Sequence, residues 1–365
     1  MGRQLIFSGG YTEDAFMASG EVVPGRCPGI ICWALENGTL TQCSQPAPAV
    51  NPSCVLVHPT APYLYCVNEV KTLGGLPGAS VSAYEIFDEK GNLRLLNQQA
   101  TAGADPCHLA FSPDGNYLIA ANYSGGSVCV FPILADYSLG HACCLLRHHG
   151  AGTNPQRQEG PHPHQILLHP QKNLLYVSDL GLDRLCCYEG QWERGWLQPR
   201  EQLDLEVPAG QGARHGIFSA DGSRLYLMTE MGCTIHVYTW NEERTERIQA
   251  VPLAQQGGRN LGAAIRLHPN GKWLYASVRG ADLIGVCRVE EDGRLTLLDQ
   301  VPVHGEIPRD ILVSPDGTYV LAGCQDSHQV SLFSVDQKTG GLTFLRACSG
   351  FGSVTTLCPW NGIME

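Results

Sequence analysis

One short pattern occurs six times along the chain, at intervals of 46 to 57 residues. Each copy begins with His or Ser, passes through a turn rich in Pro, Asp, Asn and Gly, and ends in an apolar run. The copies start at His58, Ser112, His169, Ser219, His268 and Ser314. Self-similarity at a period of about 50 residues is typical of propellers and other repeat architectures, in which each copy is one structural unit.

Each copy has the pattern of a β-hairpin followed by further strands. In the second copy, Ser112-Pro-Asp-Gly115 forms the turn, because Pro fixes φ, Asp bonds to nearby backbone and Gly accepts positive φ. Mainly apolar residues stand on both sides of this turn, at 108–111 and 117–121. A third run follows at 127–131, and the fifth copy shows a fourth run at 293–298. Four strands per repeat of this length predict a propeller blade.

The two ends of the chain supply the pieces of one more blade. Residues 352–359 resemble an innermost strand, and residues 5–8 and 29–33 resemble the next two strands. We therefore predict an all-β, seven-bladed β-propeller, a single domain over residues 1–365, whose last blade is closed by N- and C-terminal strands. Closure removes exposed sheet edges. A pair of β-sandwiches would not repeat one template six times, and a WD-type propeller would carry Trp-Asp dipeptides, which are absent.

Composition excludes several classes of partner. The formal net charge of −11 disfavours nucleic acid or an anionic membrane surface, since both attract basic proteins. No apolar run is long enough to span a membrane, and residues 1–11 lack the pattern of a signal peptide. The 16 cysteines form no C-x-x-C pair, which argues for buried thiols in a reducing compartment. We expect a cytoplasmic protein; the sequence predicts no particular oligomeric state.

Two positions of the template carry most of the charged residues. Five residues before the template begins, at the start of the preceding strand, stand Ser53, Cys107, His164, Arg214, Ala263 and Arg309. Eleven residues after it begins, at the far end of the second strand, stand Glu69, Tyr123, Leu180, Glu230, Arg279 and Gln325. In an antiparallel hairpin these two positions lie at the same end. The charged members should therefore meet at one mouth of the channel, although single charges at strand ends are often only solvated or paired across strands.

Several further residues stand near this predicted mouth. In Gly160-Pro-His-Pro-His-Gln165 two histidines two residues apart could bind a metal, but Pro163 disturbs the strand and no third ligand is evident. We predict His164 in the pocket, His162 nearby and no metal. Asn154 and Arg157 are expected in a loop over the mouth. His148, His149 and His215 are expected to be structural or surface residues.

The sequence resembles a known family in five places. They are Asn122-Tyr-Ser-Gly-Gly-Ser-Val128, Gly160-Pro-His-Pro-His-Gln165, Asp179-Leu-Gly-Leu-Asp-Arg184, Gly212-Ala-Arg-His215 and Ile307-Pro-Arg-Asp310. These segments are similar to the seven-bladed lactonases, which include propeller-type 6-phosphogluconolactonase and the fungal carboxy-cis,cis-muconate lactonizing enzyme. The resemblance covers nearly the whole chain and is specific for the family rather than for the substrate.

The resemblance implies a set of site residues. A histidine, two arginines and a glutamate form the proposed catalytic group of the muconate enzymes, and they match His164, Arg214, Arg279 and Glu230. Three neighbours differ, because Ala-Arg-His, Thr-Glu and Val-Arg-Gly replace the family's usual Pro-Arg-His, Asn-Glu and Asn-Arg-Gly. The expected substrate-binding residues are Glu69, Arg309, His162 and Gln325.

The function implied is hydrolysis of a sugar-acid lactone without a cofactor. The arginines would hold an anionic lactone or hydroxy acid and stabilise charge on the lactone oxygen, while Glu230 or His164 activates water. His164 could also protonate the leaving alkoxide. Two alternatives stay open: a cycloisomerase that lactonises a carboxymuconate-type diacid, and a non-catalytic interaction propeller, since propellers host many functions.

Overall fold

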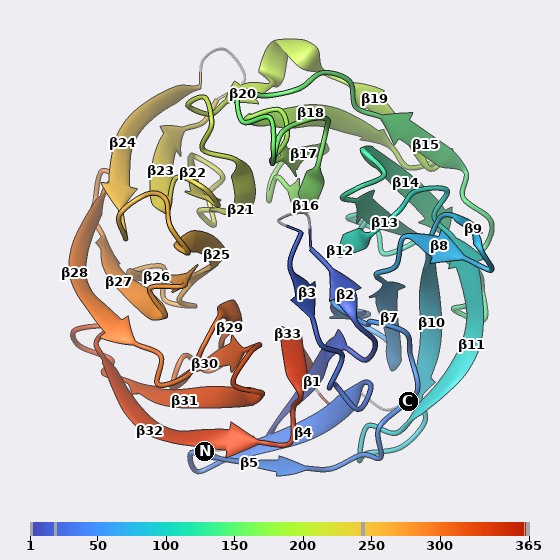
Figure 1. Cartoon of the computed structure of the whole chain (residues 1–365), viewed down its shortest axis with the longest axis horizontal. Helices are drawn as coiled ribbons and strands as arrows, with labels where there is room; N and C mark the ends of the chain where they lie inside the picture. Colours follow the sequence, from blue (N-terminus) through green and yellow to red (C-terminus); the bar gives the residue numbers. More distant parts are fainter. Residues whose placement is uncertain (1–2, 18–19, 242–244, 361, 363–365) are drawn as a thin grey trace.

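The computed structural model describes residues 3–17, 20–241, 245–360 and 362, and it arranges them as a closed ring of seven antiparallel sheets (Figure 1). This confirms the predicted seven-bladed propeller. The innermost strands, which surround the central channel, are β6 (Val55–Val57), β12 (Pro106–Phe111), β16 (Pro163–Leu168), β21 (Ala213–Phe218), β25 (Leu261–Leu267), β29 (Pro308–Val313) and β33 (Ser353–Trp360). The second strands are β7 (Tyr63–Asn68), β13 (Tyr117–Asn122), β17 (Leu174–Asp179), β22 (Arg224–Thr229), β26 (Trp273–Arg279), β30 (Tyr319–Cys324) and β1 (Gln4–Tyr11).

The outer half of each blade continues the same antiparallel order. The third strands are β10 (Ser80–Ile86), β14 (Ser127–Pro132), β18 (Arg184–Gln191), β23 (Thr234–Thr239), β27 (Leu283–Val289), β31 (Gln329–Val335) and β4 (Ile31–Glu36). The outermost strands are β11 (Leu93–Ala100), β15 (Cys144–Arg147), β19 (Trp196–Pro199), β24 (Glu246–Pro252), β28 (Leu295–Pro302), β32 (Leu342–Ser349) and β5 (Thr39–Gln42). Short additions are β20 (Leu205–Glu206), which pairs with β18, the 3-10 turn η1 (Glu201–Leu203), and the hairpins β2 (Ala15–Phe16) with β3 (Val22–Val23) and β8 (Thr72–Leu73) with β9 (Leu76–Pro77).

The ring closes between the two ends of the chain. Strand β33 pairs with β1, for example at Phe7 with Cys358, and β1 pairs in turn with β4, for example at Phe7 with Cys32. The C-terminal strand is therefore innermost and the N-terminal strands stand behind it, as the sequence predicts. This arrangement leaves no open edge at the seam between the ends of the chain.

The first residue of the template explains how neighbouring blades fit together. The Nε2 atoms of His169 and His268 lie 3.3 Å and 2.9 Å from the carbonyl oxygens of Gly222 and Gly317, in the turns of the following blades. Both glycines have φ near +70°, at 72° and 71°. A Cβ atom on either would lie within 2.5 Å of the imidazole, so both the conformation and the contact require glycine.

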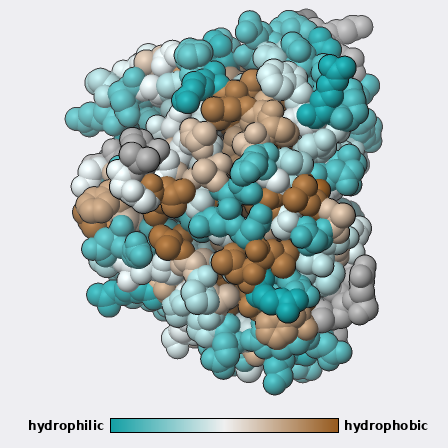
Figure 2. All heavy atoms as spheres, turned by 90° about the vertical axis from the view of Figure 1, so that its right-hand side faces the viewer, coloured by the Kyte–Doolittle hydropathy of each residue, from teal (hydrophilic) through white to brown (hydrophobic). Residues whose placement is uncertain are grey.

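Apolar side chains fill the space between blades rather than the channel. One cluster joins Tyr226 and Val237 of one blade with Ile265, Leu274 and Cys287 of the next, all at most 1% exposed. Burial of each large apolar side chain contributes roughly 1.5–3 kcal/mol. The outer wall in Figure 2 shows several separate hydrophobic areas divided by hydrophilic side chains. Among the described residues, no helix has the length and apolar character needed to cross a membrane.

Candidate active site

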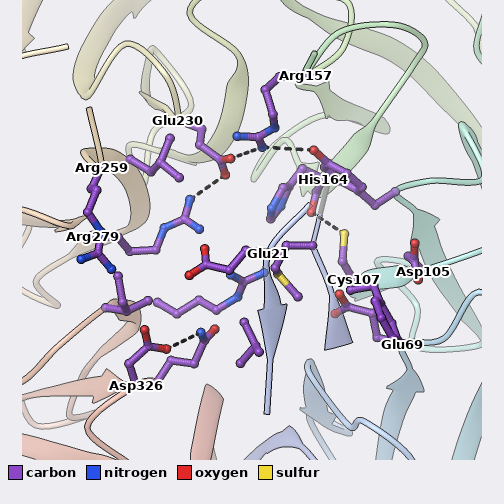
Figure 3. Close-up of a pocket in the computed structure, with 18 of the residues that line it drawn as sticks. Glu21, Glu69, Asp105, Cys107, Arg157, His164, Glu230, Arg259, Arg279 and Asp326 are labelled. Atoms are coloured by element: carbon purple, nitrogen blue, oxygen red, sulfur yellow. Dashed lines mark hydrogen bonds and ion pairs between the residues drawn. The ribbon is translucent and has the colours of Figure 1, made fainter. Parts of the chain in front are cut away.

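A cavity of about 260 Å³ opens at the end of the channel where the innermost strands begin. We call it the upper cavity. Its wall combines strand ends with the loops between strands, and Figure 3 shows charged side chains pointing into it from opposite sides. The lining residues are Phe16, Met17, Glu21, Val23, Glu69, Asp105, Cys107, Tyr123, Ser124, Arg157, His164, Glu230, Gly258, Arg259, Leu261, Arg279, Ile307, Arg309, Gln325 and Asp326.

A β-bulge recurs at the start of four innermost strands. The pairing register slips by one residue between Pro106 and His108, and the same slip occurs in β16, β21 and β29. The unpaired residues are Cys107, His164, Arg214 and Arg309, four of the six members of the first template position. A bulge re-aims a side chain without breaking the sheet. The repeat therefore places these four side chains at equivalent points around the channel.

Three arginines converge on one carboxylate at the centre of the site. Arg214 Nε lies 2.9 Å from Glu230 Oε2, and Arg279 Nη2 lies 2.7 Å from the same oxygen. Arg157, from the loop between β15 and β16, pairs with Oε1. The backbone of Glu230 is fixed as well, because its N–H donates to Gly212 and its carbonyl accepts from Gly262. Since one negative charge faces three positive charges, the cluster keeps a surplus of positive charge for a ligand.

Burial and these arginines set the protonation states of the cluster. Burial alone would raise the pKa of Glu230, but Arg279, Arg157 and Arg214 hold it well below its usual range. Burial and then Arg214 lower the pKa of His164 well below that of a free imidazole. Burial and the nearby Arg279 also lower the pKa of Arg214, to about 9. At neutral pH, Glu230 is thus an anion, Arg214 a cation and His164 a neutral imidazole whose Nδ1 has no partner among the described residues.

The opposite side of the cavity carries carboxyl groups instead. Burial raises the pKa of Glu69, although Arg309 opposes this, and Glu69 accepts a hydrogen bond of 3.1 Å from the Tyr11 hydroxyl. Asp105, which precedes β12, also has a pKa raised by burial. Arg309 stands between the sides, with its guanidinium 5.6 Å from the centre of the Tyr11 ring. In Figure 3, Glu69 and Asp105 lie across the cavity from Arg259, Arg279 and Glu230.

The structure brings together most of the residues selected from the sequence. Six of them line the upper cavity: His164, Glu230, Arg279, Glu69, Arg309 and Gln325. Arg214 lies just beneath, where it contacts Glu230 and lines a second cavity further down the channel. Their roles in binding and catalysis stay predictions.

His162 is the exception among these residues, because it lies in the wall of neither cavity. Its ring stacks on Tyr123 with centroids 4.5 Å apart, and its Nε2 lies 3.2 Å from a carboxylate oxygen of Glu159. His162 therefore stands behind Tyr123, which lines the upper cavity. Arg157 does stand at the mouth, as expected, and His148 is buried against Asp179 at 2.6 Å.

Several lining residues escaped the sequence analysis. The hairpin of β2 and β3 lies over the centre of the ring (Figure 1) and contributes Phe16, Glu21 and Val23 to the wall. The signal available was the long segment between the first two N-terminal strands, which no template copy contains. Asp105 stands one residue before β12 with φ at 51°, at the template position where Ile307 has φ at 55°. A comparison of that position across the copies would have found it.

The described residues include no group of three or more His, Cys, Asp or Glu side chains placed to hold a metal ion. The residues that could hold a ligand are therefore the arginines, the carboxyl groups and the neutral imidazole already named. Such a set can bind an anion, accept hydrogen bonds from hydroxyl groups and accept a proton.

Comparison with known proteins agrees with this architecture. The family model described as "Lactonase, 7-bladed beta-propeller" matches residues 6–357. A 6-phosphogluconolactonase of Bacillus subtilis (strain 168) is 30% identical over 333 residues, which cover 89% of this chain and 93% of that protein. A solved protein of Bacteroides fragilis NCTC 9343 has a TM-score of 0.89 at 31% identity and 98% coverage of both chains.

A second solved structure, the periplasmic gluconolactonase of Pseudomonas aeruginosa, has a TM-score of 0.87 at 28% identity, with 98% of this chain and 99% of that chain covered. The family model and both solved structures thus match this chain over almost its full length. The chain belongs to the seven-bladed β-propeller lactonase family.

Proposed function

We propose that this protein hydrolyses the lactone of a sugar acid to the open hydroxy acid. The proposal is supported by its similarity to a 6-phosphogluconolactonase and a gluconolactonase. The single observation that carries it within the molecule is the cluster of three arginines on Glu230, the arginine side, which faces Glu69 and Asp105, the carboxyl side, across the upper cavity. Glu21 and Asp326 also line this wall.

This division suits a ligand with two different ends. Arg157 and Arg279 can hold an anionic or carbonyl oxygen through charge-assisted hydrogen bonds. Glu69 and Asp105 can accept hydrogen bonds from hydroxyl groups, which are the other feature of a sugar acid. The cavity of about 260 Å³ has room for one sugar ring with its substituents.

His164 is the general base in this proposal, because its imidazole is neutral and its Nδ1 is unpartnered among the described residues. It takes a proton from water as the water oxygen attacks the lactone carbonyl carbon. The negative charge on the carbonyl oxygen is stabilised by Arg279 and Arg157. The ring C–O bond then breaks, and the leaving oxygen receives the proton from His164, which gives the hydroxy acid.

Glu230 acts as a positioning residue rather than as the base. Both of its oxygens are bonded to arginines, so neither is free to accept a proton from water, whereas His164 Nδ1 has no partner among the described residues. Removing its charge would release three side chains at once. Its contribution is the geometry of the arginine side.

The alternative of a cycloisomerase acting on a carboxymuconate-type diacid fits this division less well. A diacid carries negative charge at both ends and would need cations on both sides of the cavity. Glu69 and Asp105 would repel its second carboxylate unless both were protonated. Hydroxyl groups, by contrast, bind either form of these carboxyls.

A panel of substrates tests the proposal. We expect hydrolysis of gluconolactone, its 6-phosphate or galactonolactone, followed as acid release at constant pH, and no turnover of carboxymuconate. His164→Asn should abolish most of the activity found. Turnover of carboxymuconate alone would favour the cycloisomerase. Equal rates with and without protein for every lactone would favour a non-catalytic propeller.

The cellular location stays a prediction. The sequence favours the cytoplasm, whereas the Pseudomonas relative is described as periplasmic. Fractionation of cells that express the full chain would decide between the two compartments.

A further inference from the structure

A second cavity of about 230 Å³ continues the channel beneath the upper one. We call it the lower cavity. It shares Glu69, Cys107, His164 and Arg309 with the upper cavity, so these four side chains form the layer between the two. Below that layer, innermost strands contribute the charged and imidazole side chains of His108, Arg214, His215, Arg266 and Asp310. Hydroxyl groups come from Ser53, Thr355 and Thr356.

The bulges explain why this second layer of polar residues faces the channel. In a regular strand, successive side chains point to opposite faces. At a bulge, two residues oppose one, so the alternation is interrupted. Cys107 with His108, Arg214 with His215, and Arg309 with Asp310 are such consecutive pairs, and every member lines the lower cavity. His215, expected from the sequence to be a structural or surface residue, thus lies in the wall of the lower cavity.

Most charges in the lower cavity are already balanced. Arg266 Nη2 lies 2.6 Å from Asp310 Oδ1, and Arg309 opposes Glu69. Burial together with Arg214 lowers the pKa of His215 well below its usual value, and burial lowers that of His108 to about 3. Both imidazoles are therefore neutral. The charge of Arg214 is only partly neutralised, because its partner Glu230 also pairs with Arg157 and Arg279.

Besides His164 Nδ1 in the shared layer, two buried nitrogen atoms of the lower cavity's wall have no hydrogen-bond partner among the described residues. They are Arg214 Nη1, on a residue only 2% exposed, and His215 Nδ1. A buried N–H of a guanidinium without an acceptor is costly, because the group has lost its hydration. The two atoms belong to adjacent residues of one bulge, and both residues line the lower cavity.

We propose that the lower cavity is a binding site for a small oxyanion, held between the Arg214 guanidinium and the His215 imidazole. Guanidinium groups match the geometry of oxyanions because their N–H groups diverge as a fork. The anion would complete the charge balance of the Glu230 cluster from below, while a substrate does so from above. The ion can enter from the far end of the channel, where Arg266 keeps 29% of its side chain exposed. This site goes beyond the proposed function and does not depend on it.

The position of the anion can be measured directly. Crystals of the full chain are soaked in sodium selenate, an oxyanion with an anomalous signal. We expect a peak in the lower cavity next to Arg214 and His215. Selenate bound only in the upper cavity, or in neither cavity, would overturn the proposal.

Titration calorimetry with inorganic phosphate at constant ionic strength tests the same site in solution. We expect His215→Phe, which removes the imidazole nitrogens and fills part of the cavity, to weaken one class of phosphate sites about tenfold or more. The matched control is Arg259→Gln, at the upper mouth, which should leave that class unchanged. Equal binding by wild type and His215→Phe would contradict the proposal. No lactone is present, so the result is independent of the proposed hydrolysis, and if His215→Phe does not fold, the selenate experiment decides.

Discussion

The arginine side and the carboxyl side of the upper cavity each include a residue from the end of a second strand, yet the two sides differ in chemistry. Glu69, Glu230 and Arg279 all stand at the end of a second strand, in three different blades. Glu230 collects arginines from the loops and strands around it, whereas Glu69 meets a tyrosine hydroxyl and keeps a raised pKa. The repeat thus decides where a side chain lies, and its neighbours decide what it can do.

The two sides also differ in how they are held together. On the arginine side, three cations depend on the two oxygens of one buried carboxylate. On the carboxyl side, Glu69 and Asp105 have separate partners and no shared centre. A single change should therefore disrupt the first side as a unit, whereas changes on the second side should have local effects.

The largest effect is expected for Glu230→Gln. The amide keeps the shape but removes the charge, so three buried arginines lose their common partner. Breaking a buried ion pair from one side typically costs about 3–5 kcal/mol, and loss of oriented cations costs about a hundredfold to a thousandfold in rate. Both the urea midpoint and kcat/KM should fall. Glu290→Gln, which breaks an exposed ion pair with Arg288 away from the cavity, is the control and should change each value little. Full activity in Glu230→Gln would show that the arginines are not organised by this carboxylate.

His164→Asn should come next. If the imidazole is the base, kcat falls about a hundredfold while KM changes little, because the arginines that bind substrate remain. Steady-state kinetics with the best lactone of the panel measures both constants. A rise in KM at unchanged kcat would instead assign His164 to binding, and Glu230 or a water molecule would then have to supply the base.

The repeat pattern of the sequence predicts where a residue lies in the ring, but it does not predict which side chains contact one another. The template placed His164, Arg214, Glu230 and Arg279 at one end of the channel because equivalent residues of a repeat share a location. It could not identify Arg157 as the third arginine on Glu230, since that residue comes from a loop outside the template. It also did not show that His215 faces the lower cavity, because a β-bulge cannot be recognised from the alternation of apolar and polar residues in the sequence. The closing strands, by contrast, were predictable from their apolar pattern alone.

A smaller effect is expected for Asp105→Asn on the carboxyl side. The amide oxygen still accepts a hydrogen bond, so a hydroxylated lactone should lose only about threefold to tenfold in kcat/KM, mainly through KM. The loss should be larger for a lactone with all its hydroxyl groups than for a deoxy analogue, because only the first has a donor to lose. Equal losses for both lactones would place the hydroxyl groups elsewhere in the cavity.

The smallest effect is expected from a change of pH. A kcat/KM that hardly changes with pH would show that the pKa of His164 is low. Burial, Arg214 and Arg309 keep the pKa of His164 well below the ordinary value near 6.5. A general base works when it is unprotonated, so kcat/KM should stay nearly constant from about pH 8 to about pH 6, whereas an ordinary histidine would keep only about a quarter of its activity at the lower pH. Spontaneous hydrolysis is subtracted at each pH.

The variant Arg214→Gln removes one of the two cations that lower the pKa of His164. The kcat/KM of this variant should therefore begin to fall at a higher pH than that of the wild type, whatever its absolute rate. A wild-type profile that already falls with a midpoint near pH 6.5 would mean that the arginine side does not control the protonation of His164, and the contrast between the two sides would then be one of binding alone.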